Sequence, residues 1–116
     1  MKYVHLYSGT DGKSHFEDVE VPLTLGRPQE ESSAPIKATG VLFRITGGGY
    51  DLDWHNPPRR QFVITLEGEV EITASDGTKR RFGPGDIMLA DDIKGQGHLT
   101  QGLSQKPRRA VVVTLE

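Results

Sequence analysis

Residues 61–82 read QFVITLEGEVEITASDGTKRRF, and this stretch decides the fold class. Within it, Gly68–Ala74 alternates apolar and polar residues with the period of two that a strand with one packed and one solvated face requires. The pair Asp76-Gly77 predicts a type I′ hairpin turn into a returning strand at Thr78–Phe82. Gln61–Leu66 is β-branched and aromatic, so we expect it to be a third strand, joined to the other two in a meander.

The chain on either side of this stretch has the same character. It holds 14 glycines and 7 prolines, which favours many short elements joined by turns, and no segment shows a convincing helical period. Residues 28–35 have the composition of a solvated, mobile loop. We therefore expect one all-β domain over residues 1–116, a sandwich or barrel. Its further strands are predicted at Tyr3–Tyr7, Phe16–Val21, Val41–Thr46, Ile87–Ala90 and Ala110–Leu115.

Composition excludes several classes of function. The net charge of −2, with 14 basic and 16 acidic residues, offers no basic stripe for nucleic acid. The chain has no cysteine, which excludes disulfides, thiolate metal sites and a cysteine nucleophile and fits a reducing compartment. The first residues lack the apolar core of a secretory signal, and no run approaches the length of a membrane span. We expect a cytoplasmic protein without nucleic-acid or membrane partners.

A second informative pattern lies just before the first strand of the stretch quoted above. Residues 54–61 read WHNPPRRQ and place His55 six positions before Gln61, while Gly49 precedes His55 by six. A second histidine, His98, stands among small and polar residues, where core packing does not obviously require an imidazole. A histidine and a second polar side chain followed by a β-run are typical of a small barrel that directs ligands into its interior. We therefore expect a pocket here.

With these residues the chain resembles the cupin superfamily of small jelly-roll barrels. The first cupin motif is a glycine, five residues, His-x-His, three or four residues, a glutamate, six residues and a glycine. Gly49, His55 and Gly68 match it in identity and spacing. Pro57 stands where the second histidine is expected, and Gln61 stands where the glutamate is expected.

The second cupin motif is matched more loosely, by Gly85-Asp86, by the strand predicted at Ile87–Ala90 and by His98 as its final ligand. The resemblance covers roughly residues 44–101. It implies a double-stranded β-helix whose ligands converge inside the barrel, and a homodimer, since small cupins are commonly dimeric. Members of the family hold iron, manganese, nickel, zinc or copper and catalyse dioxygenation, isomerisation or decarboxylation, whereas others bind no metal.

The resemblance implies a metal-ligand set of His55, Gln61 and His98. This set has one imidazole fewer than the family's and no carboxylate, so its attraction for a divalent iron, manganese, nickel or zinc ion is weakened. One hypothesis is a weak metal site at which a polar small molecule is bound, oxygenated or isomerised. Another is metal-free acid–base catalysis by His55 or His98, because imidazole titrates near neutral pH. The third is a non-catalytic ligand-binding module. In a purely structural role, His55 would hydrogen-bond at a strand end and Gln61 would link backbone groups.

Four further residues are candidates for binding the small molecule. Arg59 and Arg60 flank the motif and suit a carboxylate or phosphate, although solvated surface positions are the alternative. Thr65 and Thr100 share strand parity with Gln61 and His98, which predicts that they line the pocket. On the other face of the same strand, apolar side chains turned away from the pocket would support the homodimer, namely Phe62, Ile64 and Leu66. His5 and His15 lie outside the motif and are predicted to be surface residues.

Overall fold

The computed structural model describes all of residues 1–116 and contains ten strands and no helix. The expected all-β class is therefore confirmed. No segment is a helix with the length and apolar character needed to cross a membrane. The strands are β1 (Lys2–Ser8), β2 (Ser14–Glu20), β3 (Gly40–Thr46), β4 (Asp51–His55), β5 (Gln61–Glu67), β6 (Val70–Ala74), β7 (Lys79–Phe82), β8 (Ile87–Asp91), β9 (His98–Gly102) and β10 (Arg108–Thr114).

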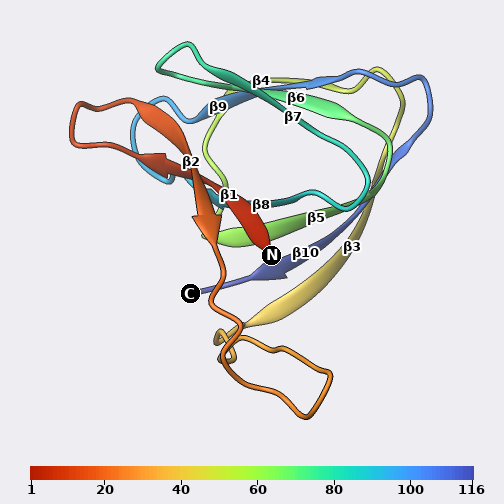
Figure 1. The fold of residues 1–116 in the computed structure, drawn as a ribbon. Helices are drawn as coiled ribbons and strands as arrows, with labels where there is room; N and C mark the ends of the chain where they lie inside the picture. Colours follow the sequence, from red (N-terminus) through yellow and green to blue (C-terminus); the bar gives the residue numbers. More distant parts are fainter.

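Two sheets face each other and enclose the interior (Figure 1). The larger sheet has six strands in the order β2-β1-β8-β5-β10-β3, and the smaller has four in the order β4-β9-β6-β7. Nearly all neighbours are antiparallel, and β1 with β8 is the parallel pair. Apolar side chains from both sheets meet in one core between them, at Leu6, Val63, Val70, Ile72, Ala74, Phe82, Met88, Ala90, Ala110 and Val112.

The eight strands expected from sequence are all present, whereas β4 and β9 were not anticipated. These two strands pair with each other, with His55 opposite His98 at the end of the ladder. Both are short and lack the β-branched runs that make a strand visible in a sequence. The pairing that brings the two histidines together is therefore a property of the tertiary structure.

The predicted meander is wrong in one respect. β6 pairs with β7 as expected, but β5 lies in the other sheet, between β8 and β10. The chain crosses from one sheet to the other at Gly68, whose φ is 82°. A Cβ at Gly68 would stand 2.9 Å from the Cα of Arg108, so the crossing needs a residue without a side chain. A two-layer fold can thus separate consecutive strands that a local reading places side by side.

The turn between β6 and β7 also differs from the predicted type I′. Gly77 has a φ of 94°, but Asp76 does not have the positive φ that a type I′ turn demands. Instead, the amide of Gly77 donates to the carbonyl of Ala74, and Thr78 closes a three-residue loop. The Asp76 carboxylate accepts hydrogen bonds from the Thr78 amide and hydroxyl, at 2.9 and 2.6 Å. These two bonds favour the longer turn.

The outer face of the six-stranded sheet is apolar. Phe62, Ile64 and Leu66 lie on the opposite face of β5 from the buried Gln61 and Val63, as the alternation predicted. Neighbouring strands continue the patch, since Phe62 and Ile64 lie opposite Val113 and Val111 of β10, which in turn lie opposite residues of β3. The residues of β3 on this face are Val41, Phe43 and Ile45, and Phe43 is 85% exposed.

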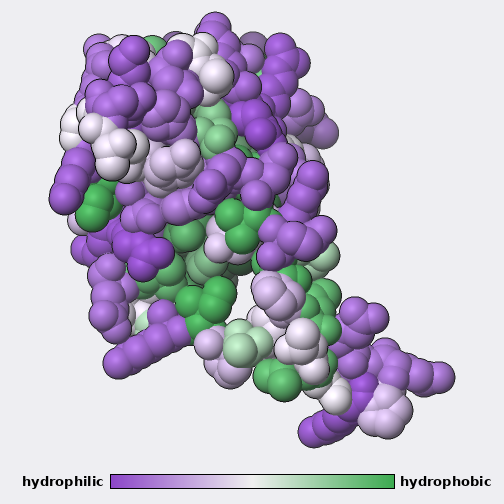
Figure 2. Space-filling model, turned by 60° about the vertical axis from the view of Figure 1, so that its left-hand side comes forward, coloured by the Kyte–Doolittle hydropathy of each residue, from purple (hydrophilic) through white to green (hydrophobic).

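The connection between β2 and β3 projects from the body of the molecule (orange in Figure 1). It contains the segment predicted as a solvated loop and is irregular apart from an antiparallel bridge between Leu25 and Ser32. Figure 2 shows apolar surface gathered where this segment meets the body. A shallow depression there is lined by Tyr3, Val21 and Ile36.

Candidate functional site

A cavity of about 260 Å³ opens between the two sheets. His55 from the end of β4, His98 from the start of β9 and Gln61 from the start of β5 all line it. The two imidazole centroids are 4.4 Å apart, with the ring planes at 60°. The structure therefore brings the three candidate ligands together in one site, although they are separated by up to 43 positions along the chain.

The His98 ring is fixed by a buried carboxylate. His98 is 4% exposed, and its Nδ1 donates to Asp92 Oδ2 over 2.6 Å. Asp92 is fully buried, and its other oxygen, Oδ1, has no hydrogen-bond partner. Because the carboxylate binds the Nδ1–H, the lone pair of a neutral His98 is on Nε2. A carboxylate behind an imidazole is the arrangement that orients metal-ligating histidines.

The His55 ring is fixed by a backbone acceptor. Its Nδ1 donates to the carbonyl oxygen of Asp53 over 2.8 Å, so Nε2 again carries the lone pair in the neutral ring. Burial lowers the pKa of His55 below its usual 6.5, the bond to Asp53 opposes that shift, and the neighbouring His98 lowers the pKa further. His55 is therefore a neutral imidazole at pH 7, able to accept a proton or to bind a cation.

Gln61 places an unpartnered oxygen in the same cavity. The residue is 5% exposed, and its Oε1 is buried without any hydrogen-bond partner. A buried amide oxygen left without a donor costs about 1–3 kcal/mol. Gln61 lines the cavity, so its amide is the neutral oxygen donor that this wall could offer to a cation or to a hydrogen-bond donor of a ligand. This observation disfavours the interpretation in which Gln61 serves only to link backbone groups.

The turn before His98 depends on a glycine. Gly97 has a φ of 78°, and a Cβ there would overlap the carbonyl oxygen of His55. The close approach of β4 and β9 at the site is thus possible only with glycine at this position. The Gly97 carbonyl also accepts a hydrogen bond of 2.8 Å from the buried hydroxyl of Ser14, at the start of β2.

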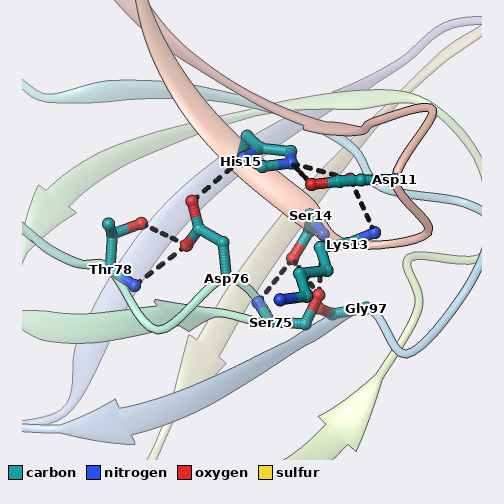
Figure 3. A network of polar contacts seen from close by, with 8 residues as sticks. All are labelled: Asp11, Lys13, Ser14, His15, Ser75, Asp76, Thr78 and Gly97. Carbon is teal, nitrogen blue, oxygen red and sulfur yellow. Dashed lines mark hydrogen bonds and ion pairs between the residues drawn. The ribbon is translucent and has the colours of Figure 1, made fainter.

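Ser14 belongs to a polar network that ties the β1–β2 hairpin to the β6–β7 turn (Figure 3). His15 lies in this network between Asp11 and Asp76, with ring-nitrogen to carboxylate distances of 2.9 and 3.0 Å. The bond to Asp11 raises the pKa of His15, and the same bond lowers the pKa of Asp11. His15 is partly exposed and does not line the cavity, and Ser14 of the same network contacts the turn before His98 through Gly97.

Two arginines that the sequence analysis did not single out line the cavity. Arg44 comes from β3 and Arg108 from β10, and neither forms an ion pair with a carboxylate. Arg108 donates from Nη2 to Thr65 Oγ1 over 2.9 Å, while its buried Nε has no partner. Burial lowers the pKa of Arg108, and the charge of Arg44 adds to the shift. The alternation of side chains along β10 could have identified Arg108 from the sequence, because Arg108 lies on the same inward face of the strand as Ala110 and Val112.

The remaining candidates are placed differently. Thr100 is buried and lines the cavity together with the two histidines. Thr65 is buried but does not line the cavity, and its hydroxyl accepts a hydrogen bond from Arg108. Arg59 is exposed, and Arg60 pairs with Asp91 over 2.9 Å on the outer side of the sheet. Neither Arg59 nor Arg60 lines the cavity, although Pro58 and Gln61 on either side of them do.

The arrangement of the strands matches a solved cupin structure. The cupin domain of Cnp3 from Schizosaccharomyces pombe superposes with a TM-score of 0.54 over 100% of this chain and 83% of that one, at 11% sequence identity. The chain folds as a cupin. The expected jelly-roll class, which rested on the spacing around His55, is thereby confirmed as to fold.

Two further structures are similar to this chain over less of its length. A DUF861 family protein from Thermotoga maritima has a TM-score of 0.47 and 21% identity, covering 66% of this chain and 77% of its own. A conserved protein of unknown function from Streptococcus pyogenes has a TM-score of 0.48 and 19% identity, covering 72% and 70%. No family model matches the sequence, and no curated protein is significantly similar to it.

Proposed function

We propose that this cupin binds a small polar organic molecule inside its barrel, at a divalent transition metal ion held by His55, His98 and Gln61. The metals that suit two imidazoles and an oxygen ligand are iron, manganese, nickel and zinc. The proposal includes oxygenase- or isomerase-type chemistry on the bound molecule. It also includes a homodimer as the assembled form.

The observation that carries the metal proposal is the unpartnered Gln61 Oε1 beside two imidazoles that line the same cavity. Both rings have Nδ1 engaged by fixed acceptors, which leaves Nε2 of each as the available donor. The residues present therefore fit a metal ion with three protein ligands and open positions. A bound metal would supply a Lewis acid that polarises an oxygen atom of the substrate.

The protonation and orientation of the proposed ligands affect how such an ion would be bound. His55 is neutral at pH 7, so it can ligate without first losing a proton. Asp92 holds the His98 ring in one orientation through the bond to Nδ1. The proposed ligands include no carboxylate, and no cluster of three or more histidine, cysteine, aspartate or glutamate side chains in the structure is suited to a metal ion. We therefore predict weak metal binding.

The same neutral donor set supports a second candidate function, a ligand-binding module without catalysis. Two imidazole nitrogens and an amide oxygen can hydrogen-bond a polar ligand directly, and nothing in that role requires a metal. In this case the cavity would select its ligand by shape and hydrogen bonding.

The experiment that separates these functions is elemental analysis of untagged protein, before and after loading with iron, manganese, nickel or zinc. About one equivalent of metal is expected in the loaded protein, and none in His98→Ala. Gln61→Leu should retain metal only at higher concentrations, because it keeps both imidazoles. His5→Ala is the matched control, since its ring is bonded to Glu17 and Asp91 outside the cavity. Absence of metal in all loaded samples would contradict the metal site and leave a metal-free binding site, either the module without catalysis or acid–base catalysis by His55 or His98.

The homodimer is supported by the apolar outer face formed by β5, β10 and β3. Exposed Phe43, Ile45 and Leu66 form one contiguous patch there, and such a patch marks an association surface. Sedimentation analysis should find a dimer that becomes monomeric in Phe43→Ser. A wild-type protein that is monomeric at micromolar concentration would contradict this part of the proposal.

A further inference from the structure

Two groups of polar side chains line the cavity. The first is the neutral set of His55, His98 and Gln61, and the second is cationic. Arg44 and Arg108 line the cavity from adjacent strands of the six-stranded sheet, where Arg44 lies opposite Ala110 in the β3–β10 ladder. No carboxylate lies within ion-pair distance of either guanidinium. We propose that the ligand of this cupin is a small organic anion, a short carbon skeleton whose carboxylate or phosphate group is bound by Arg44 and Arg108. The inference rests on the proposed function only in taking this cavity as the binding site.

Not all N–H groups of the Arg108 guanidinium have a hydrogen-bond acceptor within the protein. Its Nη2 donates to Thr65 Oγ1, and because Thr65 is fully buried, this bond fixes the position of the guanidinium. Its Nε is buried and bonded to nothing. A guanidinium carries five N–H donors in a planar fork that matches a carboxylate or phosphate. Arg108 lines the cavity, and the N–H groups of its guanidinium that are not bonded to Thr65 would donate to an oxyanion there.

The charges in the cavity favour an anion. Burial and the proximity of Arg44 both lower the pKa of Arg108, which means that the two like charges repel each other in a partly desolvated setting. Nearly everywhere else the cationic side chains are either exposed or paired, as Arg60, Arg80 and Arg81 are. The pair Arg44 and Arg108 therefore stands out as an unneutralised charge inside the barrel. A bound oxyanion would relieve this repulsion.

The apolar lining and the volume of the cavity indicate the carbon skeleton and the size of the ligand. Between the arginines and the imidazoles the wall is apolar, formed by Val63, Ile72, Met88 and Ala90. An apolar wall suits a carbon skeleton, so we infer an organic anion in preference to inorganic phosphate. The cavity volume of about 260 Å³ lies just below the usual range of roughly 300–1,000 Å³ for ligand sites, which favours a small molecule over a nucleotide sugar.

The test is a binding screen on metal-free protein, prepared on a chelating resin so that no soluble chelator competes. The probes are glycolate, pyruvate, succinate, benzoate, methyl phosphate and glycerol phosphate, each compared with the neutral amide or alcohol of the same skeleton. Calorimetry and thermal shift should show that at least one anion binds and that its neutral counterpart does not. Carboxylates and phosphate esters are separate arms, and binding in either arm identifies the acid group.

Arg108→Met and Arg44→Met should each weaken the binding of that anion about ten- to hundredfold, because each removes a charge-assisted hydrogen bond. Arg59→Met is the matched control, since Arg59 is exposed outside the cavity, and it should bind the anion like the wild type. Removing one of two repelling charges should also raise the melting temperature of the free protein. If Arg108→Met does not fold, Arg44→Met provides the same test.

Three results would overturn the inference: no probe binds the wild type at millimolar concentration, the neutral counterparts bind equally well, or both arginine variants keep full anion affinity. Metal content is measured on a separate loaded sample of each variant. Anion binding without any metal would therefore refute the metal site and retain this inference. Metal binding without arginine-dependent anion binding would refute this inference and retain the metal site.

Discussion

Two regions of this protein are organised around histidine, and they shift the pKa of the ring in opposite directions. In the cavity, His55 is partly buried beside a second imidazole, and its pKa is lowered. At the β1–β2 hairpin, His15 lies between the carboxylates of Asp11 and Asp76, and its pKa is raised. The neutral form of the side chain is thus favoured in one place and the charged form in the other. The difference teaches that the neighbours, and not the residue type, decide which histidine is available to bind a ligand.

The backbone supports the same contrast. Gly97 beside the cavity and Gly12 in the hairpin both have positive φ, at 78° and 81°. A Cβ at Gly97 would overlap the His55 carbonyl, whereas a Cβ at Gly12 would meet nothing within 4 Å. The cavity is therefore built from close backbone contacts, and the hairpin turn from local conformation alone.

The largest expected effect comes from breaking that close contact. Gly97→Ala should cost about 2–5 kcal/mol of unfolding free energy, because it adds a backbone clash to the strain of a positive φ. Gly12→Ala is the control and should cost about 1 kcal/mol, from the strain alone. Chemical denaturation of both variants measures the difference. Equal losses in the two would contradict the distinction drawn between the regions.

The next effect concerns the carboxylate behind His98. Asp92→Asn should lower the unfolding free energy by about 1.5–3 kcal/mol, since it weakens a buried, charge-assisted hydrogen bond. It should also reduce metal affinity about ten- to hundredfold through loss of the ring's orientation. Asp11→Asn removes the corresponding partner of the partly exposed His15 and should leave metal affinity unchanged. Identical metal binding by Asp92→Asn and wild type would refute the role given to Asp92.

A smaller effect is expected on acidification. The folded pKa of His55 is lowered from 6.5, so the unfolded chain binds more protons between the two values. Stability should therefore be fully present above about pH 6.5 and decrease as the pH falls through the folded pKa. His55→Gln, which cannot titrate, should lose this acid-side decrease. Denaturant midpoints from pH 4 to pH 8 measure it, and a steeper acid decrease in the variant would show that the sign is wrong.

The smallest effect has the opposite sign and belongs to the hairpin. The folded pKa of His15 is raised above 6.5, so its contribution is present below pH 6.5 and is lost as the pH rises through the folded value. The stability difference between wild type and His15→Gln should shrink with rising pH. Titration of the His15 ring protons by NMR gives the pKa directly, and a value below 6.5 would remove the contrast with His55.

How much of the site was predictable follows from these particulars. His55, Gln61 and His98 were recognised from spacing, and the structure places all three in one cavity. Arg59 and Arg60 were chosen because they adjoin the motif, yet proximity in sequence did not place them in the cavity. Arg44 and Arg108 line it because the β3–β10 ladder brings them there. Charged residues from distant strands carry no local signature of shared location.

The fold divides along the same line. The sequence by itself determined that the chain is all-β, where eight of its strands lie and which side chains of β5 face inward, because a period of two and turn residues are local properties. Tertiary structure decided that β5 and β6 belong to different sheets, that β4 and β9 exist at all, and that the β6–β7 turn has three residues. The physical reason is that strand pairing and sheet packing depend on partners far along the chain, and their free energy outweighs local preference.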